Sequence, residues 1–222
     1  MPEAQPLELA QNPLHSPLKH QYETLEQQHR ADTLGMWVFL GTEVLFFGGL
    51  ITGYAMYRSS YPAVFAEASH TLDLASGTLM TMVLLASSLT MALAVRSAQL
   101  GKRQLLAVFL ILTIVLGAAF LGIKGNEYYH KWQDHHLPGR GFVWDGPDPG
   151  IAQLFLYFYF ALTGLHALHM IIGIGIMAGL LVLAGRWRVK SYTVEISGLY
   201  WHFVDIVWIF LFPLLYLVDR HR

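Results

Sequence analysis

The sequence predicts an all-α integral membrane protein, a bundle of five transmembrane helices with a cytoplasmic N-terminus and an external C-terminus. Two observations predict this class. Hydrophobic residues make up 55% of the 222 residues and charged residues 13%, whereas a soluble domain carries about 25% charged residues. Five segments are also apolar over the length of about 20 helical residues that a bilayer core requires.

The five spans are expected at about 34–57, 74–95, 105–129, 150–184 and 194–218, and together they form one membrane domain over 34–219. The fourth span is long enough for a helix of roughly 50 Å, so it must tilt or project beyond the membrane. Pro213 lies within the fifth span and is expected to kink its last turns.

The flanking segments predict the orientation. Residues 1–33 are polar, contain four prolines and lack the apolar core of a signal peptide, so the first span is expected to insert uncleaved. Two connections on the side of the N-terminus carry basic residues: Arg96, Lys102, Arg103, Arg186, Arg188 and Lys190. The positive-inside rule makes this side cytoplasmic and leaves the tail 220–222 outside. The connection 124–150 is polar, aromatic and rich in turn residues, which favours a folded external cap.

Charge and cysteine content exclude several classes of function. The net charge is −1 and no basic patch stands out, so a nucleic-acid partner is not expected. The chain has no cysteine, which excludes disulfides, iron–sulfur clusters and a cysteine-ligated copper centre.

Five ionisable side chains lie deep within the spans, away from their ends, where they are costly and indicate either a function or a buried partner. Glu43 is in the first span, His166 and His169 are in the fourth, and His202 and Asp205 are in the fifth. At 1.5 Å per residue their depths are similar, so they are expected to form a buried polar cluster in the cytoplasmic half of the bilayer. The spacing of three residues places His166 beside His169, and His202 beside Asp205.

Three roles are open for this cluster. It can be an interhelical polar clamp, because membrane helices have no hydrophobic driving force between them. It can be a protonatable network coupled to ion movement. It can also be a metal site, since these are ligand types, although the spacings HxxH and HxxD match neither the zinc nor the di-iron helix motifs.

Four motifs resemble, in order, those of subunit III of the haem–copper oxidases, the cytochrome c oxidase type. They are FLGTEVLFF at 39–47, KGNEYYHKW at 124–132, TGLHALHM at 163–170 and YWHFVDIVWIFLF at 200–212. Glu43 matches the membrane-embedded glutamate of that family, and Glu127 and Tyr128 match its helix-end Glu-Tyr pair. The likeness extends over residues 30–219.

The resemblance implies a non-catalytic subunit of a proton-pumping terminal oxidase that reduces O2 to water in aerobic respiration. It implies no catalytic residue, metal or cofactor in this chain, with the haems and copper carried by partner subunits. The partners implied are subunit I by direct packing, subunit II and other subunits of the complex, with structural phospholipids as further candidates. Its expected location is a bacterial-type inner membrane, which it crosses several times. The typical relative has seven spans, so the missing two-helix arm is either absent or supplied by another chain.

Other functions remain open. A quinol oxidase or a nitric-oxide-reductase-associated complex can use a similar subunit, because other chains bind the electron donor. A free-standing proton transporter is motivated by the acid–histidine cluster, and a membrane metalloenzyme by its ligand types.

Overall fold

The computed structural model describes residues 22, 24–139, 141–185 and 190–219, and these fold into α-helices without a strand. Five helices are long and apolar enough to cross a membrane, as predicted: α2 (Leu25–Ser60), α4 (Leu74–Gln99), α5 (Arg103–Gln133), α6 (Pro149–Gly185) and α7 (Ser191–Tyr216). A short helix that the sequence analysis did not predict, α3 (Pro62–His70), joins α2 to α4. The described residues do not include 1–21 or 220–222. They also do not include Arg186 and Arg188.

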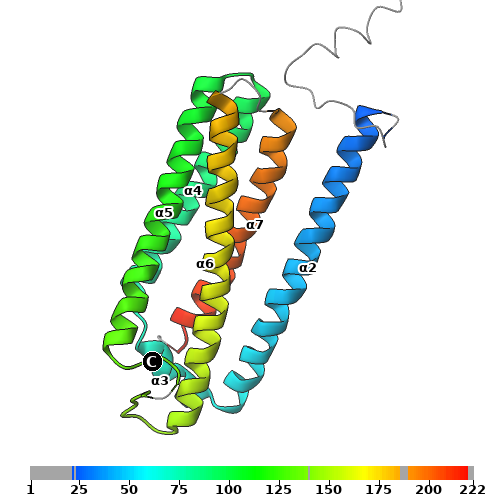
Figure 1. Cartoon of the computed structure of the whole chain (residues 1–222). Coiled ribbons are helices and arrows are strands. Elements are labelled where there is room, and N and C mark those ends of the chain that lie inside the picture. The colour runs from blue at the N-terminus through cyan, green and yellow to red at the C-terminus, as the bar shows by residue number, and fades with distance from the viewer. Residues whose placement is uncertain (1–21, 23, 140, 186–189, 220–222) are drawn as a thin grey trace, which may run out of the picture.

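Four of the long helices form a closed bundle. In the order α4, α5, α6, α7 each helix packs against the next, and α7 packs back against α4. Helix α2 lies along the side formed by α6 and α7 (Figure 1). In the most apolar stretch of α7, 56% of the residues are buried inside the protein, compared with 11% in α2. Helix α7 is therefore central, and α2 is peripheral.

Two tyrosines attach α2 to α7 near the ends of the bundle. We call the end where α2 begins the N-side and the end where α7 finishes the C-side. On the N-side, the Tyr192 hydroxyl donates a 2.6 Å hydrogen bond to the carbonyl of His29 and lies 3.0 Å from the Thr33 hydroxyl. On the C-side, the Tyr54 hydroxyl donates to the Leu214 carbonyl at 2.7 Å. Each hydrogen bond gives a polar group a partner that lipid tails could not provide.

The helix starts follow ordinary capping chemistry. The Thr24 hydroxyl accepts a hydrogen bond from the backbone amide of Gln27 at the start of α2. The Asp73 carboxylate accepts from the backbone amides of Ala75 and Ser76 at the start of α4. Such caps satisfy amide groups that have no partner within the helix. Helix α7 continues through Pro213 to Tyr216.

A buried tryptophan sets the spacing of the central helices. The indole of Trp201 on α7 lies against Gly117 of α5 and Gly173 of α6. A Cβ atom at Gly117 would lie 2.8 Å from the indole Cη2, and one at Gly173 would lie 2.8 Å from Cζ3. The indole N–H donates to the Ser87 hydroxyl of α4 at 3.2 Å. Four helices therefore meet around one side chain, and two of them approach it only because they carry glycine.

The connection between α5 and α6 is folded over the C-side of the bundle. The Val143 amide donates to the His135 carbonyl at 3.1 Å, and the rings of Phe142 and Trp144 stack with 6.4 Å between centroids. The His136 ring packs against both of these rings. Partial burial lowers the pKa of His136 below its usual value, and the positive charge of nearby Lys131 lowers it further. The fold of this loop therefore favours neutral His136.

Candidate functional site

The carboxyl group of Glu43 on α2 meets the imidazole of His169 on α6. Glu43 Oε2 lies 3.2 Å from His169 Nε2, and His169 Nδ1 lies 2.9 Å from the carbonyl oxygen of Leu165. A carbonyl only accepts hydrogen bonds, so these contacts assign a hydrogen to Nδ1. One further proton then joins Nε2 to Glu43, either as a carboxylic acid donating to neutral imidazole or as imidazolium donating to carboxylate.

Aromatic side chains enclose this pair. The ring of Phe47 lies 5.4 Å from the His169 ring, and the ring of Tyr200 lies 6.5 Å from it. The Tyr200 hydroxyl donates to the His169 backbone carbonyl at 3.0 Å. The side chains of His169 and Glu43 are only 11% and 18% exposed. The pair is thus a largely buried contact that joins peripheral α2 to the bundle.

A second polar group, centred on Lys124, lies inside the C-side half of the bundle. Lys124 Nζ donates to Glu127 Oε2 at 3.1 Å, to the Tyr159 hydroxyl at 3.0 Å and to the Tyr216 hydroxyl at 2.7 Å. The Tyr216 hydroxyl in turn donates to the Glu127 carboxylate, 2.8 Å from Oε1 and 2.9 Å from Oε2. The two charged side chains are 3% and 6% exposed. This group connects α5, α6 and α7.

Tyr128 belongs to the same region but bonds separately. Its hydroxyl lies 2.6 Å from the Thr163 hydroxyl, which donates to the Tyr159 carbonyl at 2.6 Å. Since a threonine hydroxyl has one hydrogen, Tyr128 must be the donor in the first bond. Glu127 and Tyr128 are therefore neighbours in sequence with different structural partners.

His202 bonds to a side chain that the sequence analysis did not single out. Its Nδ1 lies 2.8 Å from the Ser88 hydroxyl of α4. Asp205 is buried and lies near Ser88, but neither carboxyl oxygen has a partner in hydrogen-bonding geometry among the described residues. The predicted neighbours His202 and Asp205 are therefore not joined by a direct imidazole–carboxyl bond. Both side chains lie near Ser88 instead.

His166 is enclosed by aromatic rings. It is 1% exposed, with the ring of Phe120 at 5.3 Å and that of Trp208 at 5.2 Å. Neither ring nitrogen meets a hydrogen-bonding group among the described residues. Although His166 and His169 are three residues apart on α6, only His169 bonds to Glu43.

The structure thus distributes the five predicted side chains over separate places. Glu43 joins His169, and His202 joins Ser88 with Asp205 nearby. His166 is buried apart from both pairs. Lys124 was missed because it begins the stretch 124–150, which the sequence predicts to be an external connection, whereas α5 continues to Gln133. The sequence signal for this buried pair was the spacing of three residues between the lysine and the glutamate of KGNE, which places them on one helix face. Among the described residues, no three His, Cys, Asp or Glu side chains are grouped to hold a metal ion.

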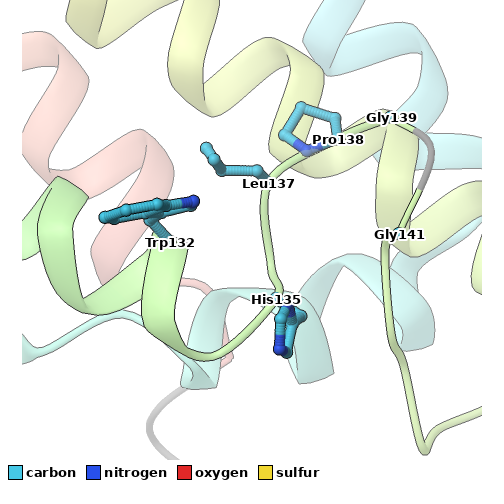
Figure 2. A pocket seen from close by; sticks show the side chains of 6 residues that line it. All are labelled: Trp132, His135, Leu137, Pro138, Gly139 and Gly141. Carbon is cyan, nitrogen blue, oxygen red and sulfur yellow. The ribbon is translucent and has the colours of Figure 1, made fainter.

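A surface cavity of about 230 Å³ lies on the C-side connection. It is lined by Trp132, His135, Leu137, Pro138, Gly139 and Gly141. Figure 2 shows the side chains of Trp132, Leu137 and Pro138 in a row, with the His135 ring pointing away from Leu137 and Pro138. The Trp132 and Leu137 side chains are 61% and 39% exposed. Polar and apolar atoms contribute about equally to the surface of this cavity, and none of its lining residues belongs to the polar groups in the bundle.

Comparison with known proteins identifies the family. The family described as Cytochrome c oxidase subunit III matches residues 150–219. "Quinol oxidase subunit 3" of Bacillus spizizenii is 32% identical over 91% of this chain and 93% of the relative. "Cytochrome c oxidase subunit 3" of Alkalihalophilus pseudofirmus is 32% identical over 88% and 89%. "Cytochrome bo(3) ubiquinol oxidase subunit 3" of Pseudomonas aeruginosa is 33% identical over 83% of each chain. Five membrane helices, motifs in the family's order and this coverage show that the chain belongs to the subunit III family of the haem–copper oxidases.

Proposed function

We propose that this chain is the non-catalytic subunit III of a proton-pumping terminal oxidase of the cytochrome c oxidase type, which reduces O2 to water. It packs directly on the catalytic subunit I, stabilises the complex and supports proton uptake. The observation that carries the proposal is the match of nine-tenths of the chain to oxidase subunit 3 proteins. A quinol oxidase is the second candidate, because relatives of equal identity carry both names.

The arrangement of the intramembrane histidines supports a chain without a redox centre of its own. Both nitrogens of His169 already have hydrogen-bonding partners, and His166 is enclosed by Phe120 and Trp208. His202 uses Nδ1 to bind Ser88. The haems and copper are accordingly assigned to partner subunits.

Orientation in the membrane follows from the basic residues. Arg96, Lys102, Arg103 and Lys190 all lie near the N-side ends of their helices. The positive-inside rule then places the N-side in the cytoplasm and the connection between α5 and α6 outside. The bacterial relatives support a multi-pass location in a bacterial inner membrane.

Purification of the tagged chain from its native membrane tests the proposal. We expect a haem-bearing complex that consumes O2, and its turnover with reduced cytochrome c or with a quinol identifies the electron donor. Removal of this chain should shorten the active lifetime more than it lowers the initial rate. A chain that is monodisperse alone and never copurifies with haem would overturn the assignment.

Transport measurements separate this function from a free-standing transporter. The purified chain in liposomes is expected to carry no proton current, and Glu43→Gln should not change that result. Proton transport by the chain alone, abolished by Glu43→Gln, would favour the transporter instead.

A further inference from the structure

His202 has an unusual position among the ionisable side chains inside the described spans. It lies near the middle of the 26 residues of α7, and its partner Ser88 lies near the middle of the 26 residues of α4. Nδ1 bonds to Ser88, but Nε2 reaches the outer surface and has no hydrogen-bonding partner among the described residues. The α4–α7 face therefore presents an unpaired polar atom at mid-membrane depth.

Hydrocarbon is a poor environment for this atom. Lipid tails offer no hydrogen bond, and a polar group left unpaired in the bilayer core costs several kcal/mol. Ionisable side chains within membrane spans accordingly face protein or water-filled space. The position of His202 Nε2 thus argues that protein, and not lipid, covers this face.

The surface around His202 suits a helix. Leu85 and Ala92 are exposed on α4, three and four residues from Ser88, and Ile206 is exposed on α7, four residues from His202. Interfaces between membrane helices combine apolar and small side chains with polar contacts, because close packing and interhelical hydrogen bonds replace the hydrophobic driving force.

The outer face of α5 provides a contrast at similar depth. Val108, Leu112 and Val115 are exposed there, at 50%, 42% and 56%. All three side chains are apolar, as a lipid-facing surface requires. The α4–α7 face and the outer face of α5 therefore differ in the nitrogen of His202 and not in how exposed their apolar side chains are.

We propose that the α4–α7 face around His202 docks a transmembrane helix of the haem-bearing partner, which presents a hydrogen-bonding side chain to His202 Nε2. This inference rests on the proposed function and adds the face and the contact through which the partner binds. Ser88 orients the imidazole by its bond to Nδ1, so that Nε2 points outward.

Photocrosslinking in the assembled complex tests the docking face. A photoreactive amino acid is placed at Ile206, which is 50% exposed, or at Val115 as the control, which is 56% exposed. At 1.5 Å per residue, the two positions lie about 23 and 18 Å from the N-side starts of their helices, both within the bilayer core. We expect a crosslink to the haem-bearing chain from position 206 and only lipid adducts from position 115.

Substitution of His202 tests the contact itself. His202→Gln retains a hydrogen-bonding group, whereas His202→Leu has none. We expect His202→Leu to reduce the haem-bearing partner retained per chain about tenfold in detergent, with His202→Gln close to the unchanged protein. Helical content and monodispersity of the Leu variant, measured on the same sample, show that it has folded.

The outcomes separate this inference from the function on which it rests. If the chain copurifies with haem but crosslinks from position 115 and not from position 206, the docking face is wrong and the subunit assignment stands. Equal partner retention by folded His202→Leu and His202→Gln would also overturn the hydrogen bond. If no haem copurifies with the unchanged chain, the proposed function itself fails.

Discussion

Glu43 and His169 hold one proton between them, because His169 Nδ1 already donates to the Leu165 carbonyl while Nε2 faces the Glu43 carboxyl at 3.2 Å. The contact joins α2 to α6 between the two tyrosine attachments near the ends of α2. Either protonation state satisfies both groups, so the pair avoids an unpaired charge in the membrane.

Substitution of Glu43 should separate hydrogen bonding from charge. Glu43→Gln keeps a donor for His169 Nε2, so its free energy of unfolding in detergent should stay within about 0.5 kcal/mol of the unchanged chain. Glu43→Leu leaves the imidazole unpaired and should lower the free energy of unfolding by about 1–2 kcal/mol. Equal losses in the two variants would show that the carboxyl charge, and not the hydrogen bond, attaches α2.

Loss of Lys124 should be strongly destabilising. Lys124→Met leaves the buried Glu127 carboxylate without its cation, and we expect the free energy of unfolding to fall by about 3–5 kcal/mol. The double variant Lys124→Met/Glu127→Leu should lose less than the sum of the single variants, as measured by a double-mutant cycle.

An exposed ion pair in the same chain provides the control for Lys124. Arg30 and Glu26 lie on α2 with side chains 79% and 74% exposed. Arg30→Met should change the free energy of unfolding by less than about 0.5 kcal/mol, because water screens such a pair. Comparable losses from Arg30→Met and Lys124→Met would contradict a special role for the buried pair.

The contacts of Trp201 predict opposite effects for glycine substitutions on the same helices. Gly117→Ala and Gly173→Ala each place a Cβ 2.8 Å from the indole, so each should cost about 1–3 kcal/mol of unfolding free energy. Gly122 on α5 and Gly175 on α6 have no atom within 4 Å of an added Cβ. Alanine at these two positions should be neutral or slightly stabilising, since alanine favours helix. Thermal unfolding of the four variants distinguishes packing from helix propensity.

Acid should open the loop between α5 and α6. The folded loop lowers the pKa of His136 below the value of 6.5 expected when it is unfolded, mainly by burial. The unfolded loop therefore binds more protons as the pH falls through about 6.5, and the loop loses stability below that pH. Hydrogen exchange of the Val143 amide, corrected for its intrinsic pH dependence, should accelerate. His136→Phe keeps an aromatic ring and should abolish the effect; an unchanged pH response in this variant would locate the titrating group elsewhere.

Sequence alone determined the class of this protein, its five membrane helices and its family. Length and apolar composition are sufficient for a span, because a helix satisfies its own backbone in lipid whatever it packs against. The cost of ionisation in a bilayer likewise made Glu43, His169 and His202 stand out before any contact was known.

Only the tertiary structure decided which polar groups meet. Apolar residues occur on all sides of these spans, so their periodicity does not mark the face that each helix buries. Helix rotation and crossing set the contacts, and they bring Glu43 to His169, His202 to Ser88 and Lys124 to Tyr216. Depth along each helix was readable from residue number. Direction around the helix depended on packing between chain segments up to 163 residues apart.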